Sequence, residues 1–137
     1  MIINFTIPGK PLAKQRPRFT RAGRTYTPET TVMYENLIKT CFSQKYPDHV
    51  PIEGPFKLDI RAYYPIAESW PKKKKAAALI GWLKPAKPDW DNVGKIVSDA
   101  LNQIAYVDDA QAWDCHVMKV YDTVPRIEVQ IEWEDET

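Results

Sequence analysis

Two pairs of aspartates within residues 87–111 could bind a divalent metal ion. Asp89 and Asp91 are separated by one residue, and Asp108 and Asp109 are adjacent. Ionised carboxylate oxygens are the ligands that hard cations such as Mg²⁺ prefer. Lys95 lies between the two pairs and adds a positive charge. The pattern predicts a metal site for Asp89, Asp91, Asp108 and Asp109.

A helix is expected between the two acidic pairs. Its apolar positions follow one another in steps of three, one, three, one and three residues, which is the period of one helical stripe. Pro88 precedes the helix and Asp89 is a good N-cap, so Asp91 falls in the first turn, where the helix dipole favours an ionised carboxylate. Lys95 follows Asp91 by one turn. The stripe consists of Val93, Ile96, Val97, Ala100, Leu101 and Ile104.

These residues also have interpretations that involve no metal-dependent chemistry. A lone D-x-D pair is most often a helix cap or solvated surface. A calcium-binding loop starting at Asp89 is excluded, because Val93 and Ala100 occupy positions where such a loop needs oxygen ligands. Lys95 could pair with Asp91 or with Asp99 at i, i+4 spacing, which is compatible with a catalytic role.

Basic residues are concentrated in the first part of the chain. Residues 1–88 contain 16 Lys and Arg against 6 Asp and Glu, a net charge of +10, and residues 89–137 contain 3 against 12, a net charge of −9. This division suits a protein that binds a polyanion with one region and metal with another, although several late acids are expected only to solubilise a strand and the tail.

Two basic segments are candidates for DNA binding. Residues 8–26 contain no acid, and Phe19 and Tyr26 could stack on unpaired bases, while the cations supply affinity for phosphate. The competing interpretation is a solvated basic loop, and for the second segment a solvated helix end. The candidates are Lys10, Lys14, Arg16, Arg18, Arg21 and Arg24, and then Lys72, Lys73, Lys74 and Lys75.

Length and composition indicate one domain, residues 1–137, with an ordinary core. The chain has no bilayer-spanning apolar stretch and no secretory leader, so a cytoplasmic protein is expected. Cys41 and Cys115 have no metal-site spacing and are expected to be reduced. His49 and His116 are expected to be packed or exposed rather than catalytic. No nucleotide-binding glycine loop and no nucleophile triad is recognisable.

The pattern of elements predicts an α+β fold. Strands are expected at 2–7 and 56–64, a helix from Thr27-Pro28 to before Pro51, a short helix after Pro71, the 91–104 helix, and a hairpin of 112–122 and 125–133. The first helix should bury Tyr34, Leu37, Ile38, Cys41 and Phe42. The order β-α-β-(α)-α-β-β corresponds to a mixed sheet with helices packed on one face. Asp109 can join Asp89 and Asp91 only if the chain returns to the N-terminus of the 91–104 helix.

The same residues resemble a known family. The sequence KPDWDN, Lys95, the stretch Asp99-Ala100-Leu101-Asn102 and the stretch Asp108-Asp109-Ala110-Gln111 are similar to the signature of the RusA family of Holliday junction resolvases. The segments IPGKPLAKQRPRFTRAGRTYTP and SWPKKKK look similar to prophage-type members. Trp90 is bulkier than the usual aliphatic residue, and Gly94 weakens the first helical turn by up to about 1 kcal/mol relative to alanine.

The resemblance implies a small Mg²⁺-dependent endodeoxyribonuclease that acts as a homodimer on four-way DNA junctions, in a bacterial or phage-infected cell. Asp89, Asp91 and Asp109 match the metal-binding catalytic set, and Asp108 and Lys95 match further functional positions. One or two Mg²⁺ ions would activate water and stabilise the leaving oxygen. Two alternatives stay open, a non-catalytic DNA-binding module and a metal-dependent nuclease for flaps or other branched DNA.

Overall fold

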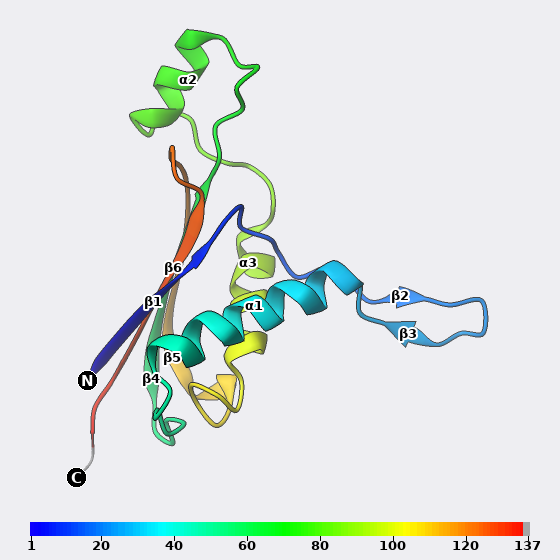
Figure 1. Cartoon of the computed structure of the whole chain (residues 1–137), viewed down its shortest axis with the longest axis vertical. Coiled ribbons are helices and arrows are strands. Elements are labelled where there is room, and N and C mark those ends of the chain that lie inside the picture. The colour runs from blue at the N-terminus through cyan, green and yellow to red at the C-terminus, as the bar shows by residue number, and fades with distance from the viewer. Residues whose placement is uncertain (136–137) are drawn as a thin grey trace.

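A computed structural model describes residues 1–135, and its centre is a four-stranded mixed sheet (Figure 1). The strands are β1 (Ile2–Pro8), β4 (Phe56–Tyr64), β5 (Ala112–Tyr121) and β6 (Arg126–Trp133), in the order β1-β6-β4-β5. Strand β6 pairs antiparallel with both β1 and β4, and β4 pairs parallel with β5. Strands β1, β4 and β6 carry buried residues at every second position, so one face of the sheet is apolar and the other is polar.

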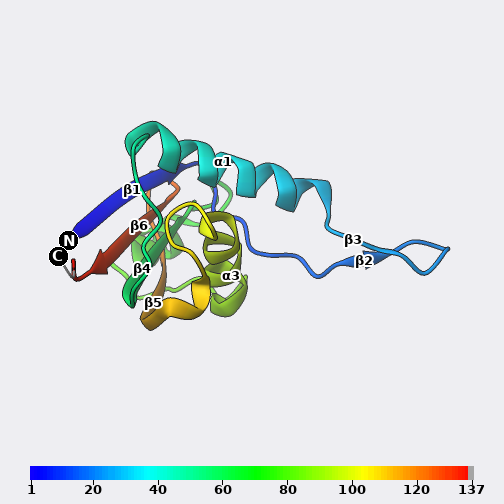
Figure 2. The same ribbon diagram turned by 90° about the horizontal axis from the view of Figure 1, so that it is seen from below.

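Two helices, α1 (Glu29–Lys45) and α3 (Trp90–Leu101), cover the apolar face (Figure 2). Helix α3 buries Val93, Ile96, Val97, Ala100 and Leu101, which is the stripe that the sequence pattern predicts. Helix α2 (Lys72–Leu79) lies beyond one end of the sheet (Figure 1). The mixed α+β fold and the predicted order of these elements are confirmed.

The predicted hairpin of the last two strands is wrong. Strands β5 and β6 are consecutive in the chain, but β4 lies between them and pairs with both. The residues between the two strands, Asp122 to Pro125, include no Asn-Gly or Asp-Gly pair that would specify a tight hairpin turn. Strand β4 takes the inner position because its whole apolar face, from Phe56 to Tyr64, is buried, whereas β5 is half exposed and suits an edge.

Helix boundaries and burial also differ from prediction in places. Helix α3 ends at Leu101 and not at 104, because Gln103 adopts a positive φ of 66° and turns the chain away. Ile104 packs against the core from the following loop. In α1, Tyr34, Ile38 and Phe42 are buried as predicted, but Leu37 is exposed and Cys41 is half-buried.

Gly94 has a packing role that the sequence does not reveal. A Cβ atom at this position would lie 3.2 Å from Cγ2 of Val117 on β5. Its absence lets α3 lie close to the sheet, which offsets the helix propensity that glycine costs.

The basic segment before α1 forms a projecting arm. Strands β2 (Arg18–Phe19) and β3 (Thr25–Tyr26) pair antiparallel and extend away from the rest of the chain (Figures 1 and 2). Across the turn, the N–H of Thr20 donates to the carbonyl oxygen of Arg24, and the N–H of Gly23 donates to the carbonyl oxygen of Thr20. Gly23 has the positive φ of 80° that the turn needs. We call residues 15–28 the basic arm.

Among the described residues, no helix combines the length and the apolar content that crossing a lipid bilayer would require.

Candidate active site

The first acidic pair lies at the N-terminus of α3. Asp89 is the N-cap residue, with φ −63° and ψ 141°, but its side chain accepts no capping hydrogen bond and instead lies 3.3 Å from Nζ of Lys87. Asp91 is in the first turn, and its Oδ1 accepts a hydrogen bond from the N–H of Asn92 at 3.0 Å. Both residues are exposed. Their remaining oxygens are therefore accessible to a cation from solvent.

The second acidic pair lies at the opposite end of α3. The N–H of Asp109 donates to Oδ1 of Asn102, the C-cap residue of α3, at 3.1 Å. Asp108 caps the 3₁₀ helix η1 (Asp109–Gln111): its Oδ1 accepts from the N–H of Ala110, and its own N–H donates to the side chain of Gln111. Since α3 has 12 residues and a helix rises about 1.5 Å per residue, about 18 Å separates the two pairs.

One chain therefore does not bring Asp109 to Asp89 and Asp91. Within residues 1–135, no three carboxylate, histidine or cysteine side chains gather closely enough to hold a metal ion. The physical reason is the direction of β5, which returns toward the N-terminus of α3 only after Asp109 has been passed. The residue that reaches that end is Lys119, whose Nζ donates to the carbonyl oxygen of Pro88 at 2.7 Å.

The electrostatics at the second pair favour the ionised form of Asp108 and disfavour that of Asp109. Burial raises the pKa of the Asp109 carboxyl above its ordinary value, and the hydrogen bond and charge of Asp108 and the charge of Asp99 raise it further, against the opposing charge of Lys95. The pKa of Asp108 is lowered, first by the hydrogen bond from the N–H of Ala110 and then by that from Asp109. Like charges so close together are costly, and a divalent cation would relieve that cost.

The donor chemistry at both ends of α3 fits a hard cation such as Mg²⁺, since all four candidate ligands are carboxylates. The number of donors at one end does not complete a site, because each end of a single chain supplies only two.

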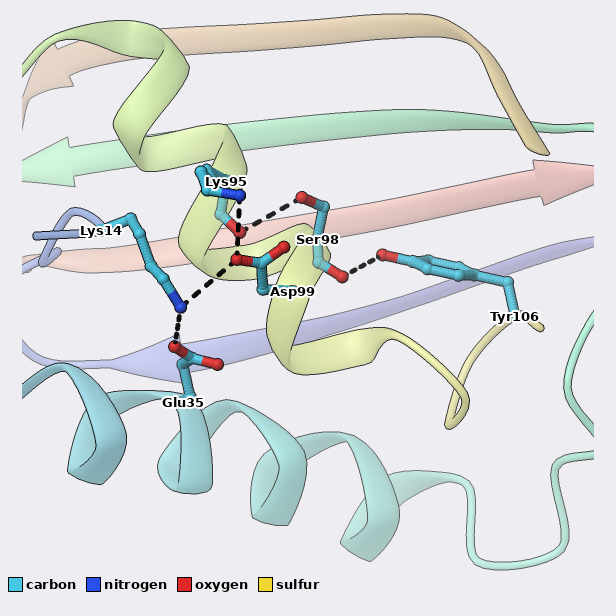
Figure 3. A network of polar contacts seen from close by, with 6 residues as sticks. All are labelled: Lys14, Glu35, Lys95, Ser98, Asp99 and Tyr106. Carbon is cyan, nitrogen blue, oxygen red and sulfur yellow. Dashed lines mark hydrogen bonds and ion pairs between the residues drawn. The ribbon is translucent and has the colours of Figure 1, made fainter. Parts of the chain in front are cut away.

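Lys95 belongs to a network of charged side chains in which Lys14 lies between α3 and α1 (Figure 3). Its Nζ lies 3.3 Å from Oδ2 of Asp99, one turn along the helix. The same oxygen lies 3.3 Å from Nζ of Lys14, which also donates to Oε1 of Glu35 on α1 at 2.5 Å. The network joins the N-terminal segment to both helices.

Lys14 is held firmly in this network. Burial lowers the pKa of its ammonium group, but the hydrogen bonds and charges of Glu35 and Asp99 outweigh that effect, and the net pKa is raised. Its backbone N–H also donates to the carbonyl oxygen of Asn92, at 2.9 Å. Lys14 thus anchors the base of the basic arm to α3, whereas the sequence suggested a cation that binds DNA. The role of Glu35 has no signature in the sequence, since 21 residues separate it from Lys14.

The other predicted cations of the N-terminal segment remain available. Arg16, Arg18, Arg21 and Arg24 are exposed on the basic arm, Lys10 is exposed before it, and no ion pair engages any of them in the described part of the chain. Phe19 is 75% exposed, which is unusual for a phenylalanine and leaves its ring free to stack.

The second basic segment forms the start of α2. Lys72, Lys73 and Lys74 are exposed and Lys75 is half-buried, with Nζ of Lys74 lying 4.0 Å from the centre of the Trp70 ring. Trp82, just after α2, is 85% exposed, and Trp90, between the first two aspartates, is 65% exposed. No pattern in the sequence marks these two indoles as a surface feature. Both lie beside the predicted DNA-binding and metal-binding residues.

The histidines do not take part in the acidic pairs. Nε2 of His49 lies 2.9 Å from the carbonyl oxygen of Ala105, and its ring packs edge-on against Phe42 and Trp133. His116 is exposed on β5, with Nε2 2.8 Å from Oδ1 of Asp114. His49 is therefore a packing residue.

Comparison with known proteins identifies the family. Residues 8–132 match the family described as Endodeoxyribonuclease RusA, so the match covers most of the chain, including both acidic pairs, Lys95 and the basic arm. The chain is also 40% identical over 135 residues to a protein of Bacillus subtilis (strain 168) described as "Uncharacterized protein YqaN", with 94% of each chain covered. This chain belongs to the RusA family of endodeoxyribonucleases, which are Holliday junction resolvases.

Proposed function

We propose that this protein resolves four-way DNA junctions by Mg²⁺-dependent paired nicking, as a homodimer, in DNA recombination and repair. Such an enzyme would act in the cytoplasm of a bacterial or phage-infected cell. The observation that carries the proposal is the placement of two carboxylate pairs, exposed except for the half-buried Asp109, at opposite ends of α3 in a chain of the RusA family.

In the proposed dimer, a two-fold axis perpendicular to α3 would bring together carboxylates that are separated in one chain. Two copies related by such an axis place their α3 helices antiparallel, so the N-terminal end of one helix faces the C-terminal end of the other. Each composite site would then hold Asp89 and Asp91 from one chain and Asp108 and Asp109 from its partner. The dimer would contain two such sites, one for each of the two strands that resolution must cut.

The carboxylates and Lys95 would have different roles at each site. The carboxylates would hold one or two Mg²⁺ ions, and a bound ion would activate water and neutralise charge on the scissile phosphate and the leaving oxygen. Lys95, exposed on α3 between the two pairs, would add a positive charge that faces the phosphate. A bound cation would stabilise the ionised form of Asp109, which burial and the charges of Asp108 and Asp99 disfavour.

The basic arm would bind the DNA outside the sites of cutting. Its four exposed arginines supply affinity for phosphate without regard to sequence. Phe19 pairs across the arm with Thr25 and presents its ring to solvent near the turn, where it could stack on a base left unpaired at the junction centre. The lysines of α2, with the exposed ring of Trp82, form a second candidate contact.

One experiment distinguishes junction resolution from cutting of other branched DNA and from DNA binding without cutting. Labelled four-way junction, flap and linear duplex are each incubated with the protein and Mg²⁺, and the products are resolved on a denaturing gel. We expect symmetric nicks in the junction, little cutting of linear duplex, and no cutting by the Asp91→Asn variant. Preferential cutting of the flap would identify a nuclease for other branched DNA, and binding of the junction without cutting would identify a non-catalytic module.

A further inference from the structure

Lys95 has a choice between two carboxylates on its own helix. Asp91 precedes it by four residues and Asp99 follows it by four, so both lie on the same face of α3. In the structure the ammonium group of Lys95 pairs with Asp99 (Figure 3). Among residues 1–135, no ion pair involves Asp91.

This choice is opposite to the intrinsic preference of a helix. An acid that stands four residues before a lysine makes a more favourable pair than an acid four residues after it. An isolated α3 helix would therefore favour the pair of Asp91 with Lys95. Contacts from outside the helix must reverse the preference.

Lys14 and Glu35 supply those contacts. The ammonium group of Lys14 bridges Glu35 and Asp99, and this contact holds the Asp99 carboxylate in one position independently of Lys95. Pairing with a carboxylate that is already ordered costs less side-chain entropy. The Asp99 side chain is also only 25% exposed, so its interaction with Lys95 is less screened by water than a fully solvated pair.

The same part of α3 is held by two further hydrogen bonds. The hydroxyl of Tyr106 donates to the carbonyl oxygen of Ser98 at 2.7 Å, and the hydroxyl of Ser98 donates to the carbonyl oxygen of Lys95 at 3.2 Å. Tyr106 is fully buried and stacks on Phe56 in the core. The backbone beneath Asp99 is therefore fixed to the core.

We infer that Asp99 is a positioning residue that holds Lys95 away from Asp91, and so keeps the Asp89 and Asp91 carboxylates free to bind a divalent cation. The inference rests on the proposed function, because it assumes that these two aspartates are metal ligands. Without the Asp99 charge, Lys95 would turn to Asp91 and compete with the cation for its oxygens.

Metal affinity measured in a double-mutant cycle tests this role. Mn²⁺ binding to the full-length protein without DNA is followed by electron paramagnetic resonance, for wild type, Asp99→Asn, Lys95→Met and the double variant. Because exposed ion pairs contribute about 0.2–1 kcal/mol, Asp99→Asn should weaken Mn²⁺ binding by about 1.4- to 5-fold. In the Lys95→Met background the same change should have no effect, since no lysine remains to move onto Asp91.

Two results would overturn the inference. One is an unchanged Mn²⁺ affinity in Asp99→Asn, and the other is an equal loss in both backgrounds, which would make Asp99 a ligand or a general source of negative charge. A melting curve accompanies each variant. If Asp99→Asn is poorly folded, Asp99→Glu replaces it in the comparison. Asp99→Glu should retain the wild-type Mn²⁺ affinity, because its carboxylate can still pair with Lys95. A loss of Mn²⁺ affinity with Asp99→Glu that persists in the Lys95→Met background would refute the positioning role.

Failure of the inference can be told from failure of the proposed function. A wild-type protein that binds no Mn²⁺ and cuts no junction would refute both the metal site and its positioning residue. A wild-type protein that binds Mn²⁺ and cuts, with no coupling between Asp99 and Lys95, would refute the positioning role alone.

Discussion

Mixing two inactive variants should restore activity if each site is built from two chains. Asp91→Asn removes a ligand from the N-terminal end of α3, and Asp109→Asn removes one from the opposite end, about 18 Å away. In a dimer with antiparallel α3 helices, a heterodimer of these two variants has both substitutions in one composite site. The other site has Asp91 from one chain and Asp109 from its partner, and is intact.

The size of the recovery follows from counting sites. With free subunit exchange at equal concentrations, about half of the dimers are heterodimers, and each has one intact site of two. The mixture should therefore show about a quarter of the wild-type number of active sites, while either variant alone shows none. A heterodimer cuts one strand only, so its product should be nicked junction rather than paired linear duplexes.

The assay is single-turnover cleavage of a labelled four-way junction after the two variants have been refolded together. Mixing Asp89→Asn with Asp91→Asn is the matched control, because both substitutions lie at the same end of α3 and every composite site in the heterodimer is then defective. No recovery with Asp91→Asn and Asp109→Asn, in dimers shown by mass to have exchanged, would refute a site shared between chains.

Three further outcomes are expected. Replacing Arg16, Arg18 and Arg21 with alanine should weaken junction binding and lower the slope of log K against log salt by about 0.9 for each lost phosphate contact, so an unchanged slope in a salt titration would mean that the arm does not touch DNA. Lys95→Ala should lose single-turnover cleavage at saturating Mg²⁺ and change stability by no more than about 0.5 kcal/mol, with partial recovery in Lys95→Arg; normal cutting or a strongly lowered melting temperature would show a structural role. Phe19→Ala should reduce the fluorescence change of a 2-aminopurine at the junction centre while Phe19→Trp retains it, and equal signals in the two variants would exclude stacking.

The spacing of apolar residues predicted α3 well, because all the residues that form this pattern lie in the helix or just after it. The steps between Val93 and Leu101 repeat the geometry of one helical face, and no distant residue can alter that pattern. A sheet with one apolar face was predictable for the same reason, since residues 56–64 alternate apolar and polar side chains. The order of the strands was not predictable, because the insertion of β4 between β5 and β6 depends on burial summed over the whole sheet.

The geometry of the candidate site depends on contacts between distant parts of the chain, which local sequence patterns do not specify. The sequence identifies the carboxylates by type and spacing, but the distance from Asp109 to Asp91 depends on where the chain turns after Leu101. Asp109 precedes β5, the strand that runs back toward the N-terminus of α3. The contact of Lys14 with Glu35 and Asp99 joins three distant parts of the chain. No spacing rule covers such a contact.

The position of β6 has a consequence for synthesis of the protein. This strand follows every other described element in the chain, yet it lies inside the sheet, between β1 and β4. A nascent chain that has emerged from the ribosome only as far as β5 has no partner for β1, and the buried positions of Ile127, Val129 and Ile131 are empty. The sheet against which α3 packs is then incomplete, and domains generally fold as units. We therefore expect the sheet beneath α3, and with it the position of the candidate site, to be completed only after β6 has been made.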